Sequence, residues 1–126
     1  MEGLELGYRS QLAQQLSVDL SVYRYRYSDV VSSTLGSQSV LVYNPLVMLA
    51  VQNLDRCNCG NGWLSGAELS VDGIVSASWR LQLSYTWTQV AMDASSNPLA
   101  EAQGRNIERA TARHVVSLRS QWNPSE

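Results

Sequence analysis

The sequence predicts an all-β protein, an antiparallel up-and-down meander of about five long strands in one domain of 126 residues. Three observations support this fold class. Apolar and polar residues alternate along several segments, as they do in strands that have one apolar and one polar face. No window of twelve or more residues shows a convincing helical spacing of apolar residues. The connections between the segments alternate between short and long, which is typical of strands that run up and down.

The first two alternating segments are joined by a tight connection at residues 13–15. Residues 4–12 place leucines and a tyrosine on one face, and polar residues with a glycine on the other. Residues 16–27 begin with the same alternation of apolar and polar residues. The segment ends in an aromatic stretch, which we call the Tyr–Arg stretch: Tyr23, Arg24, Tyr25, Arg26 and Tyr27.

The other three segments are residues 63–73, 79–92 and 114–122, and a short link at 74–78 joins the first two of them. The segment 79–92 alternates most regularly. Its apolar face consists of Trp79, Leu81, Leu83, Tyr85 and Trp87. Its polar face consists of Arg80, Gln82, Ser84, Thr86 and Thr88. This pattern predicts a long strand with two chemically different sides.

Two long connections, residues 28–62 and 93–113, complete the meander. The first contains an apolar run, 39–54, which Pro45 interrupts, so we expect one or two short strands in an excursion there. The second contains the best helical candidate of the chain, but Gly104 interrupts it and its apolar side is narrow. We therefore expect a loop there, with at most a short turn of helix.

Composition and charge argue against several classes of function. Nine basic residues, all of them arginine, nearly balance eleven acidic ones, and this argues against a nucleic-acid-binding protein. The sequence has neither the run of eighteen apolar residues that a transmembrane helix needs nor a signal peptide. It also lacks a Ser/His/Asp arrangement, paired carboxylates with a cleft-like spacing and a phosphate-binding glycine loop. We therefore expect no enzymatic activity and no cofactor.

The apolar faces of the strands have two candidate neighbours, a protein core or lipid. A soluble sandwich or small barrel would bury these faces and expose the polar ones. Three features favour lipid and a partial transmembrane β-barrel. Trp79 and Trp87 are eight residues apart, about 27 Å along a strand, which suits the apolar band of a tilted membrane strand. The segments are mostly nine to twelve residues long, as membrane strands are. Their polar faces carry both signs of charge, as a wet lumen wall does.

Five stretches of the chain form a recognisable series: residues 2–12 (EGLELGYRSQL), 16–33 (LSVDLSVYRYRYSDVVSS), 44–53 (NPLVMLAVQN), 66–87 (GAELSVDGIVSASWRLQLSYTW) and 112–122 (ARHVVSLRSQW). In order and spacing they resemble the C-terminal barrel strands of TonB-dependent outer-membrane receptors. The resemblance implies that residues 1–126 are a fragment of such a barrel. The plug domain, the segment that contacts TonB and most of the about twenty-two strands of these receptors are absent from it.

The resemblance implies an outer-membrane receptor for active uptake of a scarce nutrient, such as an iron–siderophore complex or a cobalamin. The implied partners are outer-membrane lipid, the TonB system through the missing plug, and the extracellular nutrient ligand. The short links 13–15 and 74–78 would then be periplasmic turns, and residues 28–62 and 93–113 would be extracellular loops. Two alternatives stay open: a soluble antiparallel β-domain that binds a small apolar ligand or a protein partner, and part of a passive porin.

Cys57 and Cys59 are the only cysteines, and His114 is the only histidine. A metal site needs more ligands than a Cys-x-Cys pair supplies, and His114 is not nearby in the sequence, so structural roles are favoured for all three. The spacing leaves open whether the two cysteines form a disulfide.

Charged and aromatic residues give further candidates. Glu68 is a candidate for an ion pair with Arg80 or Arg119 on the lumenal side. The Tyr–Arg stretch is predicted either to mark the outer aromatic girdle of a membrane barrel, which we favour, or to reach a ligand. The ligand-binding residues cannot be assigned from the sequence, and no catalytic, cofactor-binding or metal-binding residue is predicted.

Overall fold

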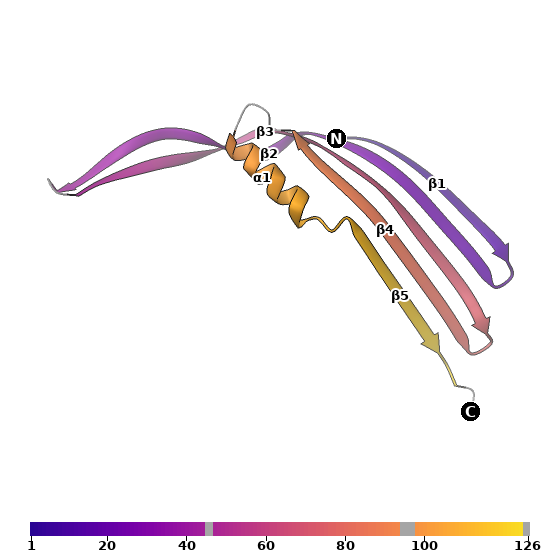
Figure 1. Ribbon diagram of the computed structural model, residues 1–126. Helices are drawn as coiled ribbons and strands as arrows, with labels where there is room; N and C mark the ends of the chain where they lie inside the picture. Colours follow the sequence, from indigo (N-terminus) through magenta and orange to yellow (C-terminus); the bar gives the residue numbers. More distant parts are fainter. Residues whose placement is uncertain (45–46, 94–97, 125–126) are drawn as a thin grey trace.

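A computed structural model describes residues 1–44, 47–93 and 98–124. It contains one antiparallel sheet of five strands in the order β1-β2-β3-β4-β5, and one helix. In chain order the elements are β1 (Glu2–Ala13), β2 (Leu16–Asn44), β3 (Val47–Ser76), β4 (Trp79–Asp93), α1 (Pro98–Ala110) and β5 (His114–Trp122). Figure 1 shows a curved, open sheet with β1 and β5 at its edges. The predicted all-β meander of five strands, part of a barrel, is confirmed.

The register aligns residues of all five strands into rows that run across the sheet. One row consists of Arg9, Asp19, Ser70, Ser84 and Ser117. The adjacent row consists of Ser10, Val18, Val71, Leu83 and Leu118. Successive residues of a strand point to opposite faces, so the two rows belong to opposite faces of the sheet. We call the face of the first row the polar face and that of the second the apolar face.

The β2–β3 hairpin is much longer than the sequence suggested. Both strands run on past their neighbours, β2 up to Asn44 and β3 from Val47, and Figure 1 shows the extension projecting away from the sheet. The expected excursion with one or two short strands is therefore wrong. Register shifts absorb the irregular residues, and one of them contains Asp29 at a φ of 60°. Pro45, the expected break, lies outside the described residues, between the two strands.

Residues 98–110 form a helix, α1, and not the loop that we expected. Pro98 is its first residue, where the missing N–H has no intrahelical partner to lose, and Arg109 lies in the last turn, where a cation suits the helix dipole. Gly104 is buried against β4, and a Cβ there would lie only 2.8 Å from the Cβ of Met92. The close packing that glycine allows outweighs its helix-propensity cost of about 1 kcal/mol.

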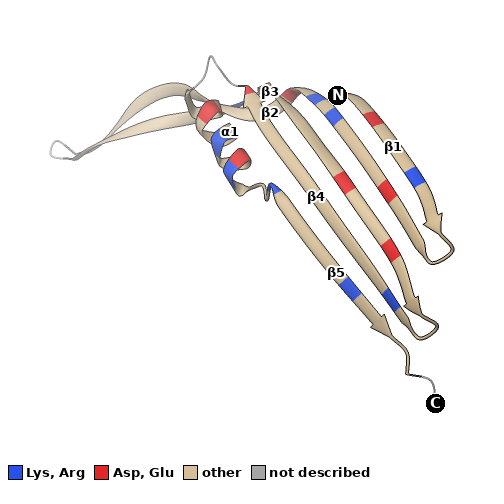
Figure 2. Cartoon of the chain, turned by 45° about the vertical axis from the view of Figure 1, so that its right-hand side comes forward, with Lys and Arg blue, Asp and Glu red and all other residues tan. Residues whose placement is uncertain are grey.

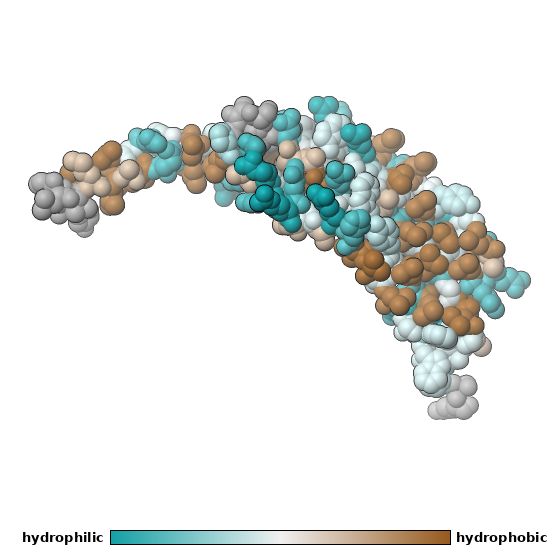
Figure 3. Space-filling model, in the orientation of Figure 1, coloured by the Kyte–Doolittle hydropathy of each residue, from teal (hydrophilic) through white to brown (hydrophobic). Residues whose placement is uncertain are grey.

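The sheet has almost no core of its own. Among the described residues only Ala100 of α1, at 3% exposure, is apolar and buried. Large apolar side chains are exposed along the strands instead, with Leu4 at 76% and Leu118 at 68%. Figure 3 shows apolar side chains gathered over the strands near the short turns and hydrophilic ones around α1. The helix in the described part of the chain is too short and too polar to cross a membrane.

Candidate functional site

A continuous apolar band crosses the apolar face of all five strands. Its members are Leu6, Tyr8, Val18, Leu20, Val22, Ala67, Leu69, Val71, Leu81, Leu83, Tyr85, Val116 and Leu118. Next to the short turns the band stops at Trp79 and Trp122, which lie opposite each other. At its other end polar residues replace it on the three inner strands, namely Arg24, Ser65 and Gln89, whereas β1 has Leu4 in the same row. The band therefore has a defined border at each end of the strands.

The height of the apolar band matches a bilayer. Trp79 and Trp87 both lie on the apolar face, as predicted, because the β4–β5 ladder has no register shift between these residues. Beyond Trp87 lies Trp63, which is opposite Ala91 and hence twelve residues along β4 from Trp79. Twelve residues span about 40 Å along a strand at ~3.3 Å each, or about 30 Å along the axis at a tilt of ~40°. The band itself stops at Gln89, ten residues from Trp79, so its height is about 25 Å, which is that of the apolar band of membrane barrels, and Trp63 lies just beyond it.

Within the height of the apolar band, the charged residues of the strands lie on the polar face. They are Glu5, Arg9, Asp19, Glu68, Asp72, Arg80 and Arg119. Figure 2 shows that both signs are scattered over the strands. Arg9 and Asp19 lie opposite each other and form an ion pair, in which Arg9 Nε donates to Asp19 Oδ2 at 2.6 Å. A surface of this kind suits contact with water and polar solutes.

The ion pairs predicted for Glu68 are not formed. The register places Thr86 of β4 beside Glu68. Arg80 is six residues from Thr86 along the same strand, and Arg119 lies opposite Gln82, four residues away. These offsets amount to about 20 Å and about 13 Å along the strands, too far for direct contact. Charge sign alone suggested the pairing, and strand register decides it.

The three tyrosines of the Tyr–Arg stretch lie on the polar face, and not in the aromatic girdle that we favoured. The β1–β2 ladder has no register shift in this part. Tyr23 and Tyr25 therefore point to the same face as the polar residues that precede them at every second position. Their rings stack with centroids 5.5 Å apart, and the Tyr25 hydroxyl donates to Glu5 Oε2 at 3.0 Å. The aromatic border of the apolar face at this end is Trp63.

Glycines on the neighbouring strands make room for these tyrosine rings. The ring of Tyr25 lies over Gly3 of β1, where a Cβ would collide with it. On the other side, a Cβ at the buried Gly66 of β3 would lie 2.5 Å from the Tyr23 hydroxyl oxygen. The two rings therefore cover three strands as one aromatic patch at the long-hairpin end of the polar face. The sequence contained a signal for this placement, because Tyr23 and Tyr25 continue the every-second-residue series of polar residues in β2.

Cys57 and Cys59 form a disulfide, with Cα atoms 5.3 Å apart, which decides a question that their spacing left open. His114 begins β5 on the apolar face. Its Nδ1 lies 2.8 Å from the Tyr85 hydroxyl, and the two rings stack. Within the described ranges, no group of three or more His, Cys, Asp or Glu residues is arranged to hold a metal ion.

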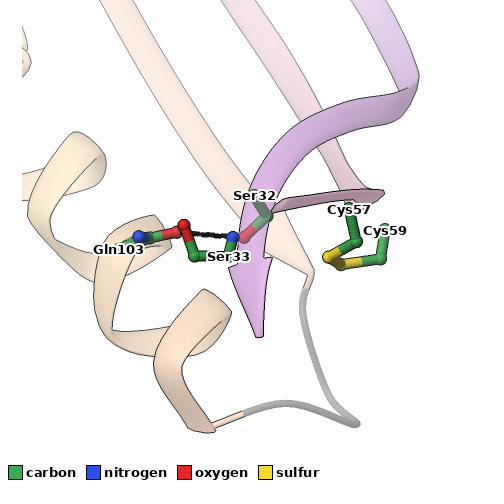
Figure 4. The surroundings of a disulfide bond; sticks show 5 residues. All are labelled: Ser32, Ser33, Cys57, Cys59 and Gln103. Atoms are coloured by element: carbon green, nitrogen blue, oxygen red, sulfur yellow. Dashed lines mark hydrogen bonds between the residues drawn. A yellow bond between two sulfur atoms is a disulfide. The ribbon is translucent and has the colours of Figure 1, made fainter. Parts of the chain in front are cut away.

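Helix α1 docks on the base of the long hairpin and on the end of β4. Gln103 Oε1 accepts hydrogen bonds from the Ser32 hydroxyl at 3.0 Å and from the Ser33 backbone N–H at 3.2 Å. Glu108 Oε1 accepts one from the Met92 backbone N–H at 2.7 Å. Figure 4 shows the two serines between Gln103 and the disulfide. Sequence reasoning missed these contacts because it assigned the helix to a loop.

A sheet with an apolar band of bilayer height on one face and charged residues on the other is the wall of a transmembrane β-barrel. Residues 2–126 match the family described as TonB dependent receptor-like, beta-barrel. The chain therefore belongs to this family, and the resemblance seen in its sequence is confirmed. Members of the family are outer-membrane transporters and not enzymes. No curated protein and no solved structure matches the chain.

Proposed function

We propose that this chain forms part of the barrel wall of a receptor that imports a scarce nutrient, such as an iron–siderophore complex or a cobalamin, across the outer membrane. We assign residues 1–126 to the barrel, and the plug, through which TonB would supply energy, to another part of the protein. The partners would be outer-membrane lipid, the TonB system and the extracellular ligand.

The observation that carries this proposal is the apolar band on a sheet without a core. A soluble β-domain stabilises its strands by burying apolar side chains. Here even Leu20, Val22 and Leu83, which lie on inner strands, remain 41%, 42% and 38% exposed. Lipid is the neighbour that covers such a face without a second protein layer, and the tryptophan borders at both ends are typical of a membrane barrel.

The two ends of the sheet support an orientation. The β1–β2 and β3–β4 turns lie at one end, where the Ile74 backbone N–H donates to Gln15 O at 2.8 Å. The long hairpin and α1 lie at the other end (Figure 1). We place the short turns in the periplasm and the long hairpin outside the cell, because bacterial barrels have short periplasmic turns and longer external loops. The polar face then lines the lumen.

Fractionation and uptake measurements on the full-length protein test this proposal. We expect the protein in the outer-membrane fraction, with different gel mobilities before and after heating. Deleting its gene should abolish uptake of one radiolabelled iron–siderophore complex or cobalamin from a panel, and loss of TonB should do the same. Uptake that survives without TonB would point to a passive porin. A folded, monomeric protein in the absence of detergent would contradict the membrane assignment.

We also infer that the chain has no catalytic role. The contacts of its single histidine support this inference, because His114 faces the apolar side and meets Tyr85 rather than a nucleophile. An assay on hydrolase substrates tests it. A turnover rate that His114→Ala abolishes would contradict the inference.

A further inference from the structure

Two arginines lie on the apolar face, directly beyond the apolar band. The guanidinium carbon of Arg24 is 4.5 Å from the centroid of the Trp63 ring, and that of Arg26 is 5.5 Å from it. Both arginines are exposed, and Trp63 is 39% exposed. Neither arginine forms an ion pair with a described residue, although the register places Glu2 opposite Arg26. Two positive charges are therefore held on one aromatic platform.

The position of these arginines identifies the medium that they meet. On the polar face, arginines would contact water in the lumen. Arg24 and Arg26 instead lie on the side that carries the apolar band, two and four residues beyond Val22 along β2. Arginine and tryptophan at this level of a membrane protein meet the lipid headgroups. The planar guanidinium also matches the geometry of phosphate oxygens.

The surface around the platform has the shape of an amphiphile site. A depression of about 260 Å³ is lined by Glu2, Gly3, Leu4, Arg24, Arg26 and Trp63. A second, mainly apolar depression of about 380 Å³ includes Leu6, Val22, Ala67 and Trp87 in its lining. Leu4 and Arg24 line both depressions, so the one that contains the charged side chains continues into the one beside the band. Such a pair of depressions suits a molecule with a charged head and an apolar tail.

We propose that Arg24, Arg26 and Trp63 bind the phosphate-bearing headgroup of a membrane lipid, whose acyl chain lies in the apolar depression. Charge complementarity favours this occupant, because two unpaired cations beside an apolar band attract an anion that carries an apolar tail. The inference rests on the proposed function in one respect, since it needs the apolar face to contact lipid.

Native mass spectrometry of the detergent-purified, full-length protein tests the proposal. The probes are phosphatidylglycerol, a glycosyl diacylglycerol with the same acyl chains but no phosphate, and inorganic phosphate. We expect phosphatidylglycerol to bind, the phosphate-free lipid to bind at least tenfold more weakly, and inorganic phosphate to compete only weakly. The double variant Arg24→Gln/Arg26→Gln should bind phosphatidylglycerol about thirtyfold more weakly, since each arginine near an anionic lipid contributes a factor of about five.

The matched control is Arg80→Gln/Arg119→Gln, which removes the same charge from the polar face and should leave lipid binding unchanged. Heat modifiability shows whether each variant is folded. A further variant, Trp63→Leu, removes the platform and should weaken phosphatidylglycerol binding about two- to fivefold.

Several outcomes would overturn the site. Equal binding of the two lipids would exclude recognition of phosphate. Equal losses in the two double variants would indicate a general effect of net charge. Full displacement by inorganic phosphate at the lipid's own concentration would indicate a free-phosphate site. If the protein fractionates with the outer membrane and the Arg24→Gln/Arg26→Gln variant still binds lipid normally, the lipid site would be refuted and the proposed function would stand. A protein that fractionates outside the membrane would refute the proposed function, whatever it binds in detergent.

Discussion

An arginine at Leu69 is predicted to destabilise the protein strongly, whereas an arginine at the adjacent Ser70 is not. Leu69 lies on the apolar face opposite Tyr85, which is six residues from Trp79 and six from Ala91, the partner of Trp63. Six residues correspond to about 20 Å along the strand, or about 15 Å of depth at a tilt of ~40°. Leu69 therefore lies near the bilayer midplane, where an arginine costs about 2–4 kcal/mol.

Equilibrium unfolding in urea of the full-length protein, refolded into phospholipid vesicles, measures this difference. Leu69→Arg should lower the free energy of unfolding by about 2–4 kcal/mol. Ser70→Arg is the matched control: it faces the lumen opposite Asp19, so a new arginine meets a carboxylate, and the change should stay within about 1 kcal/mol. A third variant, Gln89→Arg, lies at the border of the band opposite Ser65 and should cost about 0–1 kcal/mol.

The order of these three costs is the decisive result. Equal costs for Leu69→Arg and Ser70→Arg would show that both faces meet the same medium. A larger cost at Ser70 would show that the polar face is the buried one. Either outcome would refute the assignment of the apolar face to lipid, and with it the use of register to separate the two faces.

Three further predictions concern the polar face, the helix and the disulfide. Gly66→Val should displace the Tyr23 ring and lower the free energy of unfolding by about 1–3 kcal/mol, as overpacking does; a neutral result in urea unfolding would show that the ring lies elsewhere. Gln103→Ala removes the acceptor of two hydrogen bonds and should cost about 1 kcal/mol, with faster amide hydrogen exchange in α1; unchanged exchange there would contradict the docking. Cys57 and Cys59 should resist maleimide in the urea-unfolded, unreduced protein and react fully after reduction; labelling without reductant would contradict the bond.

The sequence predicted the faces of the strands because alternation with a period of two is a local property. Trp79, Leu83 and Trp87 share a face in the sequence pattern and in the register. The same rule, applied to residues 16–27, also places Tyr23 and Tyr25 on the polar face. The girdle assignment failed because it followed the chemistry of the aromatic side chains and not their parity. Wherever the ladder has no register shift, the alternation of positions along a strand predicts the face of a side chain better than its chemical type does.

The long hairpin and the helix were not predictable in the same way, because both depend on partners far away in the sequence. The strand pairing beyond Gly60 needs two irregular stretches to match each other across register shifts, which no local pattern reveals. Helix α1 has a narrow apolar side and a glycine in its middle, both unfavourable signs for an isolated helix. Its stabilising contacts are with Ser32 of β2 and Met92 of β4.

The Tyr–Arg stretch of β2 shows how a few residues of one strand can face two different media. Tyr23 and Tyr25 face the lumen over glycines of the neighbouring strands, while Arg24 and Arg26 face the opposite side beside Trp63. A strand at the border of a bilayer must satisfy water on one face and headgroups on the other, and alternation lets it do both without a bend. A one-residue slip of β2 would turn the arginines into the lumen and also place Leu20 and Val22 there. The apolar residues of β2 therefore fix the face on which the arginines lie. No change of register can turn the arginines into the lumen without also exposing the leucine and valine to water.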